Sequence, residues 1–204
     1  MKLAHVAFSC LSLYLTSACG GVPAAKPPSE LTVERLYPLR AGSVWTYDVD
    51  TGEGLPVLAI TRVTAQHDAR AEVSSGGEPI IYEQRADGLF RTDLESYVLK
   101  APIQKGTRWE QRDGASAEIT DLQKTVVAPA GTFSGCVEVS ETGGPSQKHV
   151  RTVFCPDVGP VEIESSLHIA LTGQAARVVA RLRGYDFAGA LTGAASVPAS
   201  EPIK

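Results

Sequence analysis

Two cysteines, Cys136 and Cys155, lie symmetrically about a turn and could form a disulfide. They bound CVEVSE and VRTVFC, and the turn-forming sequence ETGGPSQ lies between these two segments. An antiparallel pairing centred between residues 145 and 146 predicts a hairpin that brings the two thiols within bridging distance. The expected opposite pairs are Cys136 with Cys155, Glu138 with Val153, and Ser140 with Arg151. Two buried free thiols are the alternative, and a redox or metal role is a third reading that no Cys-x-x-Cys or nearby histidine favours.

A further thiol, that of Cys19, follows the small residues of LTSA. Upstream lie one positive charge, Lys2, and the apolar run LAHVAFSCLSLYL, which is too short to span a bilayer. This pattern predicts a secretory signal peptide over residues 1–18. LTSAC resembles the bacterial lipobox, with Thr16 where leucine is usual. An ordinary signal cut after Ala18 is the alternative, and it also makes Cys19 the first mature residue.

The count of cysteines favours acylation of Cys19. Cys10 leaves with the signal peptide, and an acylated Cys19 would leave Cys136 and Cys155 as an even pair in an oxidising compartment. Several acyl chains would then hold the protein on a membrane. The residue after Cys19 is Gly20 and not an aspartate. By resemblance to known lipoprotein sorting, this predicts a protein anchored in the outer membrane that faces the periplasm or the cell surface.

Other candidate chemistry is sparse. DVDTGEG, Asp48–Gly54, alternates acidic residues but offers too few oxygen ligands for calcium, so a hairpin turn explains it better. The mature histidines His67, His149 and His168 show no metal-binding spacing. No GxSxG, P-loop or GxGxxG occurs, although a Ser-His-Asp set could assemble through space. The sequence predicts no catalytic residue, no metal site and no cofactor.

Two sets of side chains could contact a ligand. Arg177, Arg181 and Arg183 alternate with apolar residues in RVVARLR, which suits an anionic ligand or, more simply, the solvated face of a strand. Aromatic residues could line an apolar groove, but burial in a core explains them better. These are Trp45, Tyr47, Tyr82, Phe90, Tyr97 and Trp109. Ligand-binding residues therefore stay unknown at this stage.

Composition divides the 204 residues into four segments. After the signal peptide (1–18), residues 19–30 are rich in Pro, Gly and Ala and predict a flexible tether. Residues 31–187 are long enough for a single β domain, and 188–204 predict a disordered tail. The formal net charge of −4 becomes −5 when Lys2 is removed, which argues against nucleic acid as a partner.

Apolar residues recur with a period of two almost throughout residues 31–187. Strand-like runs such as LPVLAITRV, PIIYEQ and ARVVARLRGY are separated by glycine-rich turns such as SSGGEP and ETGGPS. Turns every 8 to 12 residues or so favour antiparallel strands. We expect an all-β fold, an antiparallel, strongly curved sheet or open barrel.

A short pattern occurs twice. PLRAGSVW (38–45) and PIQKGTRW (102–109) share a Pro, an apolar residue, a Gly and a Trp at identical spacing. We expect two duplicated meanders in which Trp45 and Trp109 occupy equivalent buried positions, with coincidence of turn signals as the alternative.

YPLRAGSVWTY, PAGTFSGCVEV and PDVGPVEIE resemble segments of a broad group of uncharacterised bacterial lipoproteins and periplasmic proteins. That group shares a Tyr-Pro-Leu-x-x-Gly-x-x-Trp entry, a Pro-Ala-Gly-Thr-Phe turn and a Pro-x-Val-Gly turn. The resemblance covers most of residues 37–164 and implies an antiparallel β domain in the envelope. It supplies no catalytic residues, and Phe154 followed by Cys155 replaces the two aromatics that are usual before the last turn.

The sequence thus predicts a membrane-anchored lipoprotein of the cell envelope that acts as a non-enzymatic binding or structural module. Its partners would be the membrane, through the lipid anchor, and an apolar ligand or an envelope protein. A periplasmic hydrolase whose site forms only in three dimensions is the alternative. Convergent polar groups with perturbed acids in a cleft would favour the enzyme, and a dry apolar concavity would favour the ligand carrier.

Overall fold

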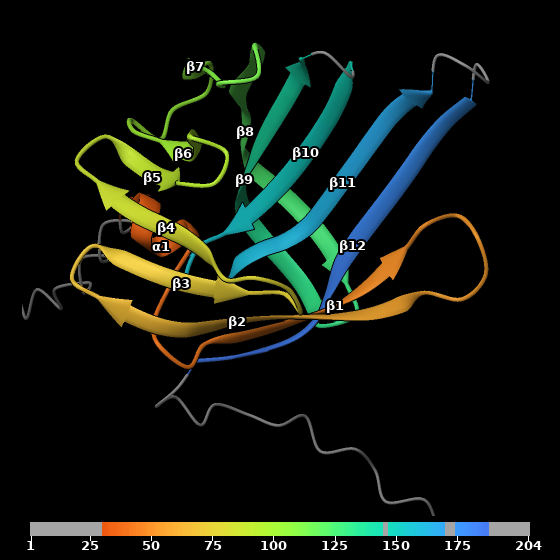
Figure 1. Cartoon of the computed structure of the whole chain (residues 1–204), viewed down its shortest axis with the longest axis horizontal. Helices are drawn as coiled ribbons and strands as arrows, with labels where there is room; N and C mark the ends of the chain where they lie inside the picture. Colours follow the sequence, from red (N-terminus) through yellow and green to blue (C-terminus); the bar gives the residue numbers. More distant parts are fainter. Residues whose placement is uncertain (1–29, 145–146, 170–173, 188–204) are drawn as a thin grey trace, which may run out of the picture. The chain divides into compact units, whose positions relative to one another are not determined.

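A computed structural model describes residues 30–144, 147–169 and 174–187. Over these residues the chain forms one helical turn, α1 (Val33–Leu36), and twelve strands of a single antiparallel sheet (Figure 1). The strands are β1 (Val44–Asp50), β2 (Val57–His67), β3 (Arg70–Ser74), β4 (Ile80–Arg85), β5 (Gly88–Arg91), β6 (Ser96–Lys100), β7 (Arg108–Glu110), β8 (Ala115–Ala128), β9 (Gly131–Gly143), β10 (Lys148–Cys155), β11 (Gly159–Ile169) and β12 (Gln174–Asp186). The sheet curls into a nearly closed barrel, so the predicted fold class is confirmed.

Several predicted segments lie outside the described residues. These are the signal peptide (1–18), the tether (19–30) apart from Glu30, Cys19 within that tether, and the tail (188–204). All of the strands fall inside the expected domain of 31–187. Within the residues that the structure describes, no helix has the length and apolar character needed to cross a membrane.

The sheet is an up-and-down meander whose two chain ends pair with each other. The strand order is β6-β5-β4-β3-β2-β1-β12-β11-β10-β9-β8-β7, so β1 and β12 are neighbours in the middle and β6 and β7 are the edges. Side chains bridge these two edges, because Trp109 Nε1 and Gln111 Nε2 both donate to the Tyr97 carbonyl, at 3.0 and 3.1 Å. We call this junction the β6–β7 seam.

The repeated sequence pattern forms the same turn twice. In both copies the glycine has a positive φ, 83° at Gly42 and 89° at Gly106, a conformation that glycine adopts at little cost. Four backbone hydrogen bonds also correspond between the copies. They are Arg40 N to Pro38 O, Ser43 N to Arg40 O, Gly42 N to Val63 O and Val63 N to Ser43 O, and in the second copy Gln104 N to Pro102 O, Thr107 N to Gln104 O, Gly106 N to Ile119 O and Ile119 N to Thr107 O.

Each copy then opens a six-stranded meander, β1–β6 and β7–β12. Trp45 and Trp109 are both buried, as the repeat predicted. The halves share connectivity and the entry turn but differ in strand length, since β9 has 13 residues where β3 has 5. Superposition of the two halves stays a prediction.

The hairpin of β9 and β10 has the predicted register. Ser140 pairs with Arg151 and Glu138 pairs with Val153, and a disulfide joins Cys136 to Cys155. Besides the face of this hairpin that points to the interior of the sheet, the face that carries the cysteines is also buried. Cys136 and Val153 are 0% exposed on that face.

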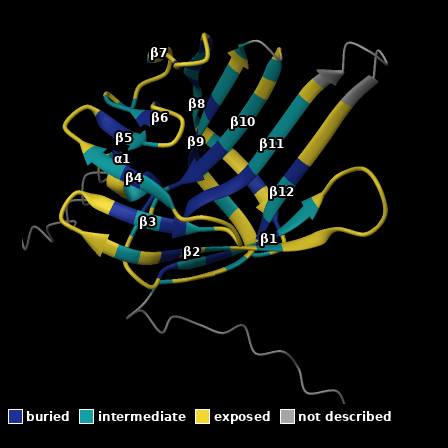
Figure 2. Ribbon diagram, viewed as in Figure 1, coloured by how far each residue is buried: buried dark blue, intermediate teal, exposed yellow. Residues whose placement is uncertain are grey.

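The β8–β9 hairpin explains this burial. Its far end extends past β10 and β11 and reaches β12, where the Ala130 amide donates to the Leu182 carbonyl at 2.9 Å. Phe133 near the same end packs against Tyr185. The end of β10 is therefore buried on both faces, one against the interior of the sheet and one against this hairpin (Figure 2).

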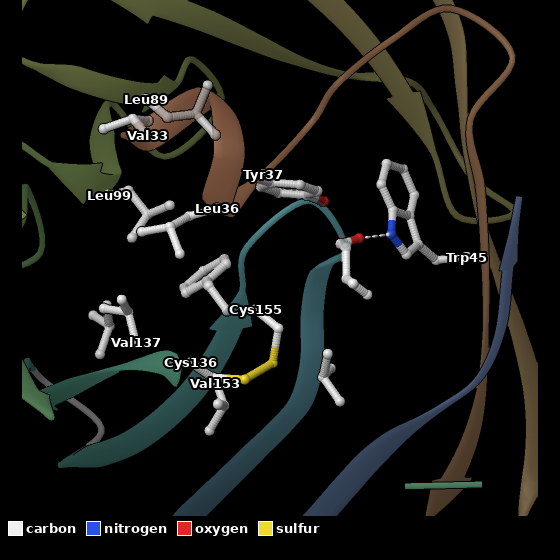
Figure 3. Packing of buried hydrophobic residues seen from close by; sticks show 14 of the residues in the cluster. Val33, Leu36, Tyr37, Trp45, Leu89, Leu99, Cys136, Val137, Val153 and Cys155 are labelled. Carbon is white, nitrogen blue, oxygen red and sulfur yellow. Dashed lines mark hydrogen bonds between the residues drawn. A yellow bond between two sulfur atoms is a disulfide. The ribbon is translucent and has the colours of Figure 1, made fainter. Parts of the chain in front are cut away.

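Trp45 anchors the interior. Its ring is 0% exposed, lies edge-on to Tyr37, and donates from Nε1 to the Val158 carbonyl at 2.7 Å (Figure 3). Gly159 has a φ of 103°, and a Cβ there would lie 3.0 Å from the indole nitrogen. The Pro-x-Val-Gly turn therefore needs glycine for both its backbone angle and its close approach to the ring. The disulfide lies in the same packed region (Figure 3).

Candidate functional site

A cavity of about 290 Å³ lies inside the curled sheet, against the β6–β7 seam. Strand alternation creates its walls, because every second residue of β10 points to the interior. Val150, Thr152 and Phe154 face the cavity, whereas Arg151 and Val153 face the other way. The apolar lining consists mainly of Leu94, Val98, Val150, Phe154, Pro160 and Ile163, and Tyr37, Tyr82 and Tyr97 add aromatic surface.

The polar lining lies largely near the β6–β7 seam. It comprises Arg91, Ser96, Gln111, Asp113, Glu141, Lys148 and Thr152. Both cations already have partners: Arg91 donates to Asp93 through Nε and Nη2 at 2.8 and 2.7 Å, and Lys148 pairs with Asp113 at 2.9 Å. These pairs neutralise the positive charges at this end of the cavity.

Glu141 is the most unusual of these groups. It lies on β9 opposite Val150 of β10 and Ala117 of β8, and it is partly buried. Burial raises the pKa of its carboxyl above the ordinary range, Asp113 raises it further, and Lys148 and Arg91 partly oppose the effect. Among the described residues the side-chain donor that reaches it is Gln111 Nε2, at 3.4 Å.

Gln111 is 8% exposed and is held by its backbone as well as by its side chain. Its amide donates to the Ala115 carbonyl at 2.8 Å, and its own carbonyl accepts from Gly114 at 3.0 Å. The side-chain oxygen Oε1 is buried without a hydrogen-bond donor in the described structure. A buried acceptor without a partner is costly, typically by about 1–3 kcal/mol.

A second hollow of about 480 Å³ lies on the other side of Tyr37 and Tyr82, which line both spaces. Burial and the neighbouring Tyr82 ring raise the pKa of Tyr37 well above its ordinary value, so this ring stays neutral. The charged residues that line this hollow are Glu34, Arg40, Asp68 and Arg70. It lacks the combination that marks the first cavity, which is an apolar wall, a carboxyl with a raised pKa (Glu141) and an acceptor without a donor (Gln111 Oε1).

The arginine stripe forms ion pairs along the sheet. Arg177 pairs with Glu164 at 2.6 Å, and Arg181 pairs with Glu162 at 3.0 Å. Arg183 pairs with Asp48 at 2.9 Å, so each arginine of the stripe has a carboxylate partner. The solvated-face interpretation describes these residues, and no anionic ligand is needed to balance them.

Within the described part of the chain one serine and one histidine side chain share a hydrogen bond, but not in a cavity. Ser140 Oγ and His149 Nε2 share a hydrogen bond of 3.0 Å on the face of β9 and β10 opposite the cavity, and His149 is exposed. Neither residue lines either hollow. This arrangement has no enclosed space for a substrate and does not favour the hydrolase hypothesis.

The remaining sequence candidates are placed as follows. Asp48 and Asp50 belong to β1, and residues 51–56 connect β1 to β2, as the hairpin interpretation predicted. Over residues 30–144, 147–169 and 174–187 no cluster of three His, Cys, Asp or Glu side chains could hold a metal ion. Of the six aromatics, Trp45, Tyr47, Tyr82 and Trp109 are buried, while Phe90 and Tyr97 are intermediate.

Sequence reasoning missed Glu141 and Gln111. A signal for Gln111 was present in the repeat, because it is the second residue after Trp109 just as Tyr47 is the second residue after Trp45. Tyr47 is buried and donates to the Pro160 carbonyl at 2.9 Å. The same inward position thus carries a tyrosine in one half and an amide beside the cavity in the other.

Two solved structures are similar to this chain in fold. No protein-family model and no curated protein matches the chain. A Bacteroides fragilis protein described as exported and YmcC-like in fold is similar over 74% of this chain and 98% of its own, at 14% identity and a TM-score of 0.47. A Parabacteroides distasonis protein described as a lipoprotein covers the same shares at 13% identity and a TM-score of 0.42. These values do not establish a shared activity.

Proposed function

We propose that this protein is a lipid-anchored component of the bacterial cell envelope that binds a small amphipathic molecule inside its β domain and catalyses no reaction on it. The cavity of about 290 Å³ carries this proposal. Ligand sites are typically concave, largely apolar and furnished with a few convergent polar groups, over roughly 300–1,000 Å³. At about 290 Å³ this cavity lies just below that range, and it has both kinds of lining.

Other features support the cellular setting. LTSAC places an acylatable thiol at the start of the mature chain, and the Cys136–Cys155 disulfide suits an oxidising compartment. Gly20 after Cys19 favours sorting to the outer membrane. In this proposal the tether presents the β domain, and its cavity, next to the membrane surface.

The polar groups suit binding better than catalysis. Glu141 has a raised pKa, yet the serine hydroxyl on the cavity wall, that of Ser96, donates to the Leu94 carbonyl at 3.0 Å. It also accepts from the Arg112 amide at 3.2 Å. The serine hydroxyl is thus committed to the backbone.

Binding can be tested with the neutral apolar dye N-phenylnaphthylamine, whose fluorescence rises in a dry site. The sample is the full mature chain carrying Cys19→Ala, which removes the anchor and the need for detergent. Val150→Phe fills the cavity, whereas Val127→Phe adds the same ring at a position that is 72% exposed. We expect Val150→Phe to weaken dye binding by about tenfold or more and Val127→Phe to match the parent.

Thermal unfolding of each variant shows whether the fold is intact. Equal dye affinity in the parent and both variants, with all three folded, would place the dye elsewhere and refute the proposal. So would the absence of any saturable dye binding to the folded parent.

A further inference from the structure

Resting on the proposed function, we propose that the cavity selects ligands whose polar end donates a hydrogen bond, a hydroxyl or an ammonium, and rejects ligands with an anionic head. Two acceptors would receive such a head. Gln111 Oε1 has almost no exposed surface and needs a small side-chain shift toward the cavity, whereas Glu141 is only partly buried. The apolar part of the ligand would lie along Val150, Phe154 and Ile163.

The orientation of the Gln111 amide is determined by its neighbours. Nε2 faces two acceptors, the Tyr97 carbonyl at 3.1 Å and Glu141 Oε2 at 3.4 Å. Rotating the amide by half a turn would place Oε1 against the Tyr97 oxygen, which cannot donate. The oxygen is therefore held as an acceptor in a wall residue that is 8% exposed, and no donor in the described structure reaches it.

The second acceptor points to the same ligand chemistry. Glu141 receives one long hydrogen bond from Gln111 and no ion pair in the described structure. A neutral hydroxyl can donate to either oxygen. An ammonium head would instead make a charge-assisted hydrogen bond to the ionised carboxyl, which is the stronger kind.

The charges around the cavity disfavour an anion. Two cations, Arg91 and Lys148, face three carboxyls, those of Asp93, Asp113 and Glu141. Each cation is already paired at 2.7–2.9 Å. A carboxylate head would have to displace one of these partners while lying near Glu141, and the site offers no surplus positive charge for that exchange.

A homologous series of ligands tests the head group alone. Octanol, octylamine and octanoate share one chain length and differ in the polar end, and at about pH 7 the amine is cationic and the acid is anionic. Each is titrated against bound N-phenylnaphthylamine on the Cys19→Ala chain. We expect octanol and octylamine to displace the dye at concentrations about tenfold or more below that of octanoate.

Two variants assign the selectivity to its residues. Gln111→Met keeps the length of the side chain and removes the acceptor, so octanol should lose about tenfold in apparent affinity. Glu141→Gln removes the carboxyl charge, so the apparent affinity for octylamine should fall more than that for octanol. Gln123→Met, at an exposed position on β8, is the matched control and should compete like the parent. Thermal unfolding again shows whether each variant is folded. If Gln111→Met fails to fold, the ligand series on the parent and on Glu141→Gln tests the inference.

The outcomes separate the two proposals. If the dye binds and Val150→Phe weakens it, but octanoate competes as well as octanol, the cavity binds ligands and the donor-head inference is wrong. If Gln111→Met lowers the apparent affinities of all three ligands equally, Gln111 contributes shape and not an acceptor, and this result also overturns the donor-head inference. If the dye never binds in the cavity, the proposed function itself fails.

Discussion

Removing the Cys136–Cys155 disulfide should destabilise the domain by about 3 kcal/mol. The bond joins residues separated by 19 positions, and the chain-entropy relation for a loop of that size gives about 3 kcal/mol at 25 °C. Cys136 is 0% and Cys155 2% exposed, so replacing both with alanine also leaves unfilled space between β10 and the β8–β9 hairpin. The double variant Cys136→Ala/Cys155→Ala should remain folded, since domains of this size have about 5–15 kcal/mol of stability.

Urea unfolding followed by tryptophan fluorescence measures this change, because Trp45 lies close to the end of β10. The Val158 carbonyl accepts from Trp45 Nε1, and the Val158 amide donates to the Cys155 carbonyl at 3.1 Å. A reducing agent should lower the free energy of unfolding of the parent and leave that of the double variant unchanged, which is the internal control. A double variant within about 1 kcal/mol of the oxidised parent would refute the entropic reasoning.

Three further results are expected. Trp45→Ala and Trp109→Ala should each lower the free energy of unfolding by about 3–5 kcal/mol in chemical denaturation, because both rings are buried; a loss below about 1 kcal/mol at either would contradict their equivalence. Hydrogen bonds from Arg177 and Arg151 lower the pKa of Glu164 to about 2, so the stability that these bonds provide is present above about pH 4.5 and lost as the pH falls toward 2. Glu164→Gln should flatten that part of the curve of unfolding free energy against pH, and an unchanged curve would exclude the contribution. Cys19→Ala should move the protein from the membrane to the soluble fraction, and equal fractionation of parent and variant would end the lipoprotein interpretation.

The sequence was most informative where a pattern is local. Period-two alternation and glycine turns predicted the all-β class, and the turn between the cysteine segments predicted the pairing of Ser140 with Arg151. The two Pro-to-Trp patterns predicted duplicated meanders with both tryptophans buried; both rings are buried, and the turn before each has matching hydrogen bonds. In each case the residues that determine the geometry lie within a few positions of one another or of a common turn centre.

The cavity could not be predicted in this way, because its wall is assembled from strands that are far apart in the sequence. Tyr82 and Phe154 line the same space yet are 72 positions apart in the chain. The covering of Val153 by the β8–β9 hairpin was missed for the same reason, since that hairpin bends across β10–β12 only in three dimensions. Long-range packing of this kind leaves no periodic signal in either segment.

The repeat and the cavity are connected through the β6–β7 seam. A closed meander would pair β6 with β7 along their backbones, but here side chains of Trp109 and Gln111 supply the donors for the Tyr97 carbonyl. Tyr47, at the corresponding position of the first copy, donates to a backbone carbonyl of β11, so that copy leaves no unpartnered acceptor there. The substitution of an amide for a phenol at one repeated position thus both bridges the seam and leaves Gln111 Oε1 without a donor beside the cavity. Under the donor-head proposal, the position that selects the ligand is the one where the two halves of the sheet differ in chemistry while keeping the same turn.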